Sequence, residues 1–480
     1  MKKQLIKQCL ALAITSTFTS TAFAQSEVAS HHNEPRQPNV LLIFVDDIGY
    51  ADMGFQNIRQ DVVTPNMDKL ASEGAILSAG YVTGAVCGPS RAGLVTGRYQ
   101  QRYGYVDNIG PYILEPGIEQ GLDLSAQTFG DFFQQAGYTT GFIGKSHDGE
   151  DKKFWPQNRG FDYFFGFNNG AADYFVTGRN MQNAKKNAYS SIYRNDDLIA
   201  NFDGYLTDVF ADEAVNFIDR HKDEPFFLYV PFNASHGPMQ AKQQDLEKFA
   251  FIEDETRRKF VAMTYNMDVN IGKMLDKLEQ HELMEDTMVI FMSDNGGDPK
   301  DNGSFNTPLR GTKRDLWDGG IRVPFSITWK GKIPANQVID EPTIALDITP
   351  TMLAAANITL SEKDQAQLEG INLLPRLTGT QEKLEERYLY WLTPMQAAVR
   401  DDDWKLLIPN IHDTRNHMEL YKISEDVSES IDLSAQFPEQ VKRLKAALDN
   451  WNADNLPSQW GWHKETYKFD NNWRGINHDK

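Results

Sequence analysis

Residues 38 to 50 read PNVLLIFVDDIGY, an unbroken apolar run that ends in two aspartates. A strand with one exposed face alternates apolar and polar residues, so a run without alternation indicates a strand buried on both faces of a parallel sheet. Similar runs lie at residues 139–145, 225–232, 287–297 and 323–329, and the patterns at 206–221 and 257–281 are helical. This alternation predicts an α/β fold with a large, mostly parallel sheet sandwiched by helices.

The pattern changes from about residue 376. Residues 387–392, 396–408 and 418–423 are typical of short strands joined by turns, and residues 437–453 form one amphipathic helical pattern. They predict a smaller C-terminal α+β subdomain with an antiparallel sheet and a covering helix. A chain of 480 residues is long enough for this division. We therefore expect a catalytic domain at 38–375 and the subdomain at 376–480.

The N-terminus has the layout of a cleavable secretory signal. Residues 1–24 hold early lysines, an apolar run diluted by Ser and Thr, and the small-residue ending Ala22-Phe23-Ala24. The run is too short and too polar to span a membrane. We therefore expect a signal peptide at 1–24, a polar leader at 25–37, and an exported protein, periplasmic or secreted, that has no membrane partner after cleavage.

Export makes the two cysteines informative. Cys9 lies in the signal, so the mature chain would keep Cys87 alone and could form no internal disulfide. A single cysteine in an oxidising compartment indicates special chemistry. The alternative interpretation is that Cys87 is a small, buried apolar side chain.

The formal net charge of −19 restricts the partners. It argues against nucleic acid and anionic membrane surfaces, because like charges repel. If the substrate is itself an anion, its site needs local cations to overcome the field of the whole protein.

Two pairs of oxygen-bearing side chains follow predicted strands: Asp46 with Asp47, and Asp294 with Asn295. The carboxyl ends of parallel strands meet at one edge of a sheet, where such folds bind ligands. Oxygen ligands suit a hard divalent cation such as Ca²⁺ or Mg²⁺ rather than zinc. Either pair alone could instead cap a helix or form a turn.

Five further polar residues complete a candidate site: the cations Arg91, Lys145 and Lys313 and the histidines His147 and His236. The cations can neutralise an anion, and histidines can move protons near neutral pH. Taken singly, each histidine could be a satisfied core or loop residue, and each cation a solvated charge. Together they are the groups needed to cleave an anionic ester.

Residues 87–98 read CGPSRAGLVTGR, which resembles the signature of the type I sulfatases, the formylglycine-dependent family of the alkaline phosphatase superfamily. The resemblance extends through NVLLIFVDD, GKSH, FFLYVPFNASHGP, SDNGG, LRGTKRDLWDGGIRVP, WKLL and LYKISED, over nearly the whole mature chain. It implies the alkaline-phosphatase-like sulfatase fold. In this family a separate maturation enzyme oxidises the motif cysteine to Cα-formylglycine, so the resemblance implies that Cys87 is the precursor of a nucleophile.

The resemblance also implies a role for each candidate residue. Ca²⁺, with Mg²⁺ as the alternative, would be bound by Asp46, Asp47, Cys87 in its formylglycine form, Asp294 and Asn295. Arg91 and Lys145 would steady the hydrated aldehyde, and Lys145 and Lys313 would bind the sulfate. His236 would protonate the departing alcohol. His147 would then take a proton from the covalent sulfate ester, which regenerates the aldehyde and releases sulfate.

Two other functions stay open from the sequence. A phosphate or phosphonate ester hydrolase of the same superfamily shares this sheet and metal corner, although two-zinc phosphatases carry His where this chain has Asn295. An inactive protein that binds sulfated glycans is the second alternative.

The expected substrate is a sulfated carbohydrate, by analogy a galactose-based polymer such as carrageenan or a glycosaminoglycan. Four aromatic residues near the C-terminus could stack on sugar rings: Trp460, Trp462, Tyr467 and Trp473. The favoured interpretation is that this tail packs over the large domain instead.

Overall fold

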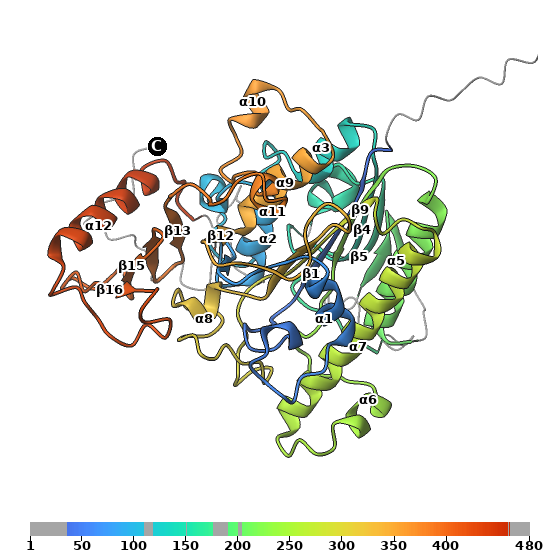
Figure 1. Ribbon diagram of the computed structural model, residues 1–480, viewed down its shortest axis with the longest axis horizontal. Helices are drawn as coiled ribbons and strands as arrows, with labels where there is room; N and C mark the ends of the chain where they lie inside the picture. The colour runs from blue at the N-terminus through green and yellow to red at the C-terminus, as the bar shows by residue number, and fades with distance from the viewer. Residues whose placement is uncertain are drawn as a thin grey trace, which may run out of the picture. The chain divides into compact units, whose positions relative to one another are not determined.

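A ten-stranded sheet passes through the part of the chain that the computed structural model describes (Figure 1). The structure describes residues 36–109, 119–149, 151–175, 191–199, 204–458 and 460. In spatial order the strands are β11 (Gln337–Ile339), β2 (Ala75–Leu77), β10 (Phe325–Thr328), β9 (Thr287–Ser293), β1 (Asn39–Val45), β8 (Phe226–Pro231), β4 (Thr139–Lys145), β5 (Tyr163–Phe167), β6 (Ile192–Arg194) and β7 (Asp197–Ile199).

The centre of the sheet is parallel, because β9, β1, β8, β4 and β5 run in one direction. On one side β10 pairs antiparallel with β9, and on the other β6 pairs antiparallel with β5. The predicted α/β fold is therefore confirmed, with antiparallel strands added at both sides of the parallel centre. The run at 323–329 contains β10, whose direction its sequence could not reveal, because an apolar run reports burial and not direction.

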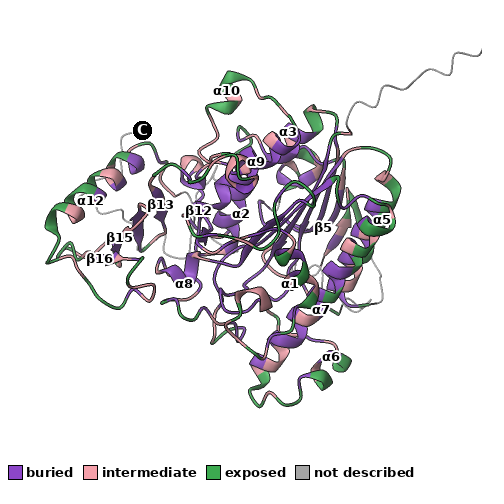
Figure 2. Ribbon diagram, in the orientation of Figure 1, coloured by how far each residue is buried: buried purple, intermediate pink, exposed green. Residues whose placement is uncertain are grey.

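β1 is buried on both faces, as its unbroken apolar run predicts. Leu42 and Phe44 pack into one hydrophobic cluster, whereas Leu41 and Ile43 pack into another on the opposite face. Figure 2 shows the central strands of the sheet buried, while α5 (Leu206–His221) and α7 (Glu255–Gln280) carry buried and exposed positions along their length. Both helices fall within two residues of the predicted ranges.

Helices cover both faces of the sheet. The cluster that contains Leu41 also contains apolar side chains of α1 (Pro65–Ser72), α5 and α7. The cluster that contains Leu42 also contains side chains of α2 (Cys87–Thr96), α3 (Phe129–Gln135) and α9 (Ile348–Ala355). The remaining described elements are α6 (Gln243–Lys248), α8 (Asp318–Ile321), α10 (Glu362–Gln365), α11 (Leu374–Leu377) and the pair β3 (Gly80–Tyr81) and β12 (Thr343–Ile344).

A four-stranded antiparallel sheet follows in the C-terminal part, as predicted. Its strands are β13 (Leu389–Leu392), β14 (Ala397–Arg400), β15 (Trp404–Ile408) and β16 (Glu419–Lys422), and α12 (Pro438–Asn452) packs on it. This sheet shares the hydrophobic cluster of α2, and the buried Trp391 ring nitrogen donates to the Val82 carbonyl at 2.7 Å. The predicted boundary at residue 375 falls within α11, and the division into two domains stays a prediction.

Several of the predictions concern the two ends of the chain, which the structure describes only in part. The signal peptide at 1–24 and the aromatic residues Trp462, Tyr467 and Trp473 lie outside the described residues. Trp460 is described: it is 3 % exposed, stacks edge-on against Tyr105 and donates to the Asp107 carbonyl at 3.0 Å. This aromatic side chain therefore packs on the protein, as the favoured interpretation holds. Within the described residues, no helix has the length and apolar character of a membrane span.

A buried ion cluster joins the C-terminal sheet to α8. The Lys405 ammonium lies 2.7 Å from Asp318 and 2.8 Å from Glu429, and all three side chains are fully buried. Asp318 also accepts from the Tyr81 hydroxyl at 2.6 Å. Burial raises the pKa of Glu429 to about 7, although Lys405 opposes this. Lys405 is therefore the cation nearest to both buried carboxyl groups, while Arg322 and Arg400 lie farther from Asp318, at 3.5 and 3.9 Å.

We predict that Lys405→Ala destabilises the protein by about 3 to 5 kcal/mol, because it removes the ammonium group that pairs with the buried Glu429 and is the nearest cation to the buried Asp318. The measurement is denaturant unfolding followed by tryptophan fluorescence. Lys422→Ala serves as the matched control: this lysine of β16 forms only surface ion pairs, so its loss should cost about 1 kcal/mol or less. Equal effects of the two substitutions would contradict the assigned importance of the cluster.

Candidate active site

The two predicted pairs of acidic and amide residues meet at one edge of the sheet. β1 and β9 pair in parallel register with Val45 opposite Ser293, so the residues that follow each strand emerge side by side. The Asp47 amide donates to Asp294 Oδ1 at 3.1 Å, and the Asn295 amide nitrogen donates to Asp47 Oδ1 at 2.7 Å. Asp46 and Asp294 are fully buried.

Three cations approach these carboxylates from different elements. Lys145, the last residue of β4, donates to Asp46 Oδ2 at 2.5 Å. Lys313 lies in the loop before α8 and donates to both Asp47 oxygens, at 2.6 and 2.8 Å. All three nitrogens of the Arg91 guanidinium donate to protein groups, two of them to Asp294 and one to the Lys145 carbonyl. Each predicted cation therefore has a buried acidic or carbonyl partner.

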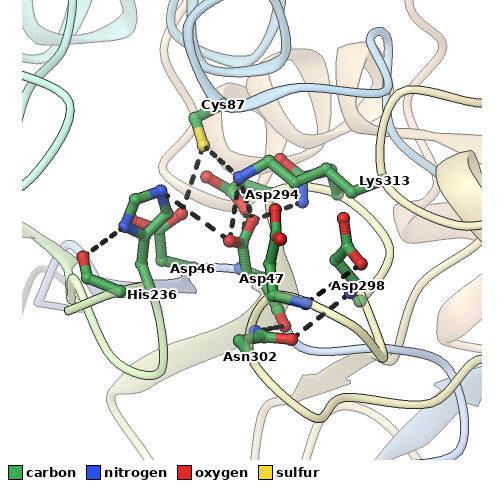
Figure 3. A network of polar contacts seen from close by, with 12 residues as sticks. Asp46, Asp47, Cys87, His236, Asp294, Asp298, Asn302 and Lys313 are labelled. Atoms are coloured by element: carbon green, nitrogen blue, oxygen red, sulfur yellow. Dashed lines mark hydrogen bonds and ion pairs between the residues drawn. The ribbon is translucent and has the colours of Figure 1, made fainter. Parts of the chain in front are cut away.

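Cys87 begins α2 and lies within this charged group (Figure 3). Its sulfur is 3.3 Å from Asp46 Oδ1 and 3.4 Å from Lys313 Nζ, and the residue is 1 % exposed. Burial alone would raise the pKa of this thiol, but Lys145 and Lys313 outweigh it and lower the pKa to about 6. The lone thiol is therefore electrostatically activated, unlike a cysteine that only fills apolar space.

The pKa directions of the carboxyl groups show the cost of placing them together. Burial raises the pKa of Asp46, and Cys87 adds to the effect. Burial and the neighbouring Asp46 raise the pKa of Asp294 to about 6. Asp47 is buried too, but Lys313 and His236 hold its pKa below the ordinary value. Burial therefore opposes the negative charge of Asp46 and Asp294, whereas Lys313 and His236 sustain that of Asp47.

A divalent cation fits this arrangement. Ligand atoms of Asp46, Asp47, Cys87 and Asp294 all lie within 4.8 Å of one another. The Asn295 Oδ1 atom is buried and has no hydrogen-bond partner among the described residues, while the nitrogen of the same amide donates to Asp47. An unpartnered buried oxygen beside clustered carboxylates is what a hard cation such as Ca²⁺ or Mg²⁺ requires. The predicted ligand set is thus brought together.

His236 lies at the edge of the same group. Its Nε2 atom is 3.8 Å from Asp47 Oδ2, and its side chain is 24 % exposed, more than the buried acids and lysines beside it. The carbonyl of Gly237 accepts from ring Nδ1 at 2.7 Å, which directs Nε2 toward the cluster. Burial opposes protonation of the ring, but the charges of Asp46 and Asp47 together outweigh it and raise the pKa of His236.

His147 follows β4 and is 4 % exposed. Its backbone has a φ of 65°, and its carbonyl accepts from the Tyr105 hydroxyl at 2.7 Å. Burial, Lys145 and Arg91 lower its pKa well below the ordinary value. The ring is therefore neutral near pH 7, and its buried Nδ1 has no hydrogen-bond partner within the described part of the chain.

The structure adds positioning residues that the sequence did not single out. Asn302 donates to the Asp47 carbonyl at 3.1 Å, and Figure 3 shows it directly beneath this aspartate. The Tyr174 hydroxyl donates to the carbonyl of His236 at 2.9 Å, and Asn108 accepts from the Gly88 amide at 2.8 Å. Asparagines in Gly- and Asp-rich segments are typical of turns, so their spacing gave no signal of a role in the site.

The comparisons with known proteins agree with this geometry. The sulfatase family model matches residues 38–358, more than half of the chain, and the model of the N-sulphoglucosamine sulphohydrolase C-terminal region matches residues 311–454. The chain belongs to the sulfatase family. The protein is therefore a sulfatase, an enzyme. All the predicted site residues lie within the part of the chain that the sulfatase model matches.

Relatives extend the likeness along most of the sulfatase. It is 30 % identical to mouse arylsulfatase J over 473 residues, which cover 88 % of this chain and 77 % of the relative. It is 31 % identical to human N-acetylgalactosamine-6-sulfatase over 379 residues, which cover 74 % and 68 % of the two chains. The crystal structure of Ps i-CgsB in complex with k-i-k-neocarrahexaose matches with a TM-score of 0.81 and 32 % identity, over 90 % of this chain and 96 % of that one.

We predict that Ca²⁺ raises the melting temperature of chelator-treated sulfatase, because a cation that joins segments far apart in sequence binds only the folded state. A ligand at a hundredfold excess over its Kd stabilises by about 2.7 kcal/mol. Differential scanning calorimetry with and without Ca²⁺ measures the shift. Asn295→Ala removes one predicted ligand without a change of charge and should reduce the shift.

Asn450→Ala is the matched control, since this asparagine lies on the exposed face of α12. The control should keep the full shift. An absent shift at saturating Ca²⁺, or a shift that Asn295→Ala leaves intact, would overturn the metal assignment.

Proposed function

We propose that this sulfatase is exported and hydrolyses sulfate monoesters of a sulfated carbohydrate, with Cys87 oxidised to formylglycine and one bound Ca²⁺. The observation that carries the proposal is the position of Cys87, whose buried sulfur lies between Lys313 and Asp46 at 3.4 and 3.3 Å. A nucleophile at this position has a cation beside it and carboxylates suited to a metal behind it. Such a site neutralises an anionic ester during attack.

The bound cation and the formylglycine would both lie among the buried carboxylates of the site. Asp46, Asp47, Asp294, Asn295 and residue 87 would hold the cation. When bound, Ca²⁺ supplies positive charge near the sulfate, and formylglycine supplies a hydrated aldehyde as the nucleophile. A separate maturation enzyme would carry out the oxidation of Cys87.

The three cations of the site would bind the sulfate group and hold the reacting residues in position. Lys313 would bind a sulfate oxygen, because its ammonium group already reaches the sulfur of Cys87. Lys145 at the end of β4 would hold the nucleophile, and its ammonium group is itself held by a hydrogen bond to Asp46. Arg91 keeps Asp294 and the end of β4 in place through its three donating nitrogens. This arrangement leaves little for the site to reorganise when the substrate arrives.

The two histidines would move protons at different steps. His236 faces the cluster from its more exposed edge, where the alcohol of the substrate would leave. It would therefore donate a proton to the departing oxygen. His147 is buried and neutral, so it can accept a proton when the covalent sulfate ester breaks down.

The relatives support a carbohydrate sulfate as the substrate class. One solved neighbour holds k-i-k-neocarrahexaose, and a curated relative is named for N-acetylgalactosamine 6-sulfate hydrolysis. A carrageenan or a glycosaminoglycan would therefore suit this chain. A phosphate ester hydrolase is the less supported function, because Asn295 and not histidine stands at the metal corner. A solely glycan-binding protein would not need this full set of candidate catalytic residues.

We predict that the protein releases sulfate from a defined sulfated oligosaccharide and that Cys87→Ala abolishes this turnover without loss of the fold. A panel of such oligosaccharides, assayed for free sulfate, identifies the substrate, and matched phosphate esters test the alternative. Peptide mass spectrometry should find an aldehyde at residue 87 after expression with a maturation enzyme. A fully active preparation with only unmodified cysteine, or preferential release of phosphate, would contradict the proposal.

We predict that His236→Ala and His147→Ala respond differently to the leaving group. A sugar alkoxide needs a proton to depart, whereas a nitrophenolate leaves almost unaided. General acid catalysis contributes a factor of roughly 10² to 10⁴, so His236→Ala should lose about that much on a carbohydrate sulfate and much less on an aryl sulfate. His147→Ala should slow both substrates and let the sulfated enzyme accumulate.

The measurements are kcat and kcat/KM for both variants on both substrates, with intact-protein mass spectrometry for the trapped sulfate. Equal losses for His236→Ala on the two leaving groups would remove its role as the acid. Lys313 would then be the next candidate for this role.

A further inference from the structure

A cavity of about 370 Å³ lies beside the start of α2. Part of its lining is chain on either side of Cys87, namely residues 84–86 and Pro89, and another part is Arg314, which follows Lys313. Its volume is within the range of about 300 to 1,000 Å³ that is usual for small-molecule sites. Because its lining flanks the nucleophile position, the cavity is placed to receive the group that carries the sulfate.

Another part of the lining comes from the C-terminal sheet. Residues 392–395, at the turn between β13 and β14, line the cavity with Leu392, Pro394 and Met395 as apolar groups. The turn is held in shape by Thr393, whose hydroxyl accepts from the Gln396 amide at 2.9 Å. The cavity therefore combines apolar side chains with a few polar groups, as small-molecule sites usually do.

The polar side chains that line the cavity can form hydrogen bonds with hydroxyl groups and an ion pair with an anion. Asp107 and Asn108 can exchange hydrogen bonds with hydroxyl groups, and the Asn108 side chain is fixed through its bond to the Gly88 amide. Arg314 is the one cation among the lining residues that the structure describes. The cavity thus offers hydroxyl recognition on one side and a guanidinium for an anion on another.

The backbone of Arg314 is held by a hydrogen bond, whereas its side chain forms only long ion pairs at the surface. Its amide donates to the Ala85 carbonyl at 2.8 Å, and its φ of 81° is rare for a residue with a long side chain. Its guanidinium lies 3.4 Å from Asp298 and 3.8 Å from Asp301, with 64 % of the side chain exposed. Such surface pairs contribute little, so an anionic ligand can compete with them.

We propose that this cavity binds the sugar ring that carries the scissile sulfate and that Arg314 binds a second anionic group of the substrate. The inference rests on the proposed substrate class of sulfated carbohydrates and assigns Arg314 as the residue that selects substrates with a second anionic group. The second anion is a sulfate or a carboxylate, on the same sugar or on the next one. A guanidinium binds either group through paired, charge-assisted hydrogen bonds.

The test compares Arg314→Ala, Arg314→Lys and a matched control, Lys300→Ala. Lys300 is an exposed cation of a nearby loop and does not line the cavity. Each variant is assayed on an aryl sulfate, a monosulfated neutral oligosaccharide, a disulfated oligosaccharide and a monosulfated oligosaccharide that contains a uronic acid. The last two substrates distinguish a second sulfate from a carboxylate.

We expect Arg314→Ala to raise KM for a doubly anionic substrate about tenfold to a hundredfold, with a much smaller change in kcat. The loss in kcat/KM should be at least about tenfold larger for that substrate than for the aryl sulfate. Arg314→Lys should recover part of the affinity, because it restores the charge without the paired donors. Lys300→Ala should leave all four substrates unchanged.

Equal losses on all four substrates, or the same change in Lys300→Ala as in Arg314→Ala, would overturn the role of Arg314. Failure of the wild-type protein to release sulfate from any substrate would instead overturn the proposed function.

Discussion

The interaction on which the site depends is the pairing of three carboxylates with three cations inside the protein. Asp46, Asp47 and Asp294 face Lys145, Lys313 and Arg91, and nearly all of these side chains are shielded from water. A charge in such a place is costly unless it is paired and hydrogen-bonded. Each pair holds its two side chains in position. The Asn295 Oδ1 atom has no hydrogen-bond partner among the described residues, so it is available as a ligand for a divalent cation. The activated thiol of Cys87 follows from the same network.

The fold supplies this pairing from distant segments. Parallel register brings the ends of β1 and β9 together, and β4 delivers Lys145 two strands away from β1. α8 packs directly behind the metal corner: a Cβ placed on Gly296 would come within 1.8 Å of the Gly319 carbonyl oxygen, so only glycine fits there. Asp318 begins this same helix and is held by Lys405 of the C-terminal sheet. The C-terminal ion cluster therefore supports the segment on which the metal corner rests.

The C-terminal sheet has a second consequence, for the substrate side. Its β13–β14 turn forms one wall of the cavity beside Cys87, and the loop that carries Arg314 forms another. Asp46, Asp294 and Lys145 lie at the ends of central strands, whereas the proposed substrate wall lies on turns and loops. Loops can vary while the strands that hold the chemistry stay the same. On the proposed function, this division would let one set of reacting residues serve different sulfated carbohydrates.

The sequence by itself predicted the central strands and the candidate site residues that these strands bring together. The unbroken run before Asp46 and the one before Asp294 predicted buried parallel strands, because a strand covered on both faces needs apolar side chains at every position. Residues 87–98 carried the family resemblance. The short edge strands and the direction of β10 escaped prediction, since two to four residues show no periodicity and burial carries no direction. Asn302, Asn108 and the turn at 392–395 gained their places only in the tertiary structure, because local sequence records which side chains are apolar but not which distant segment they will meet.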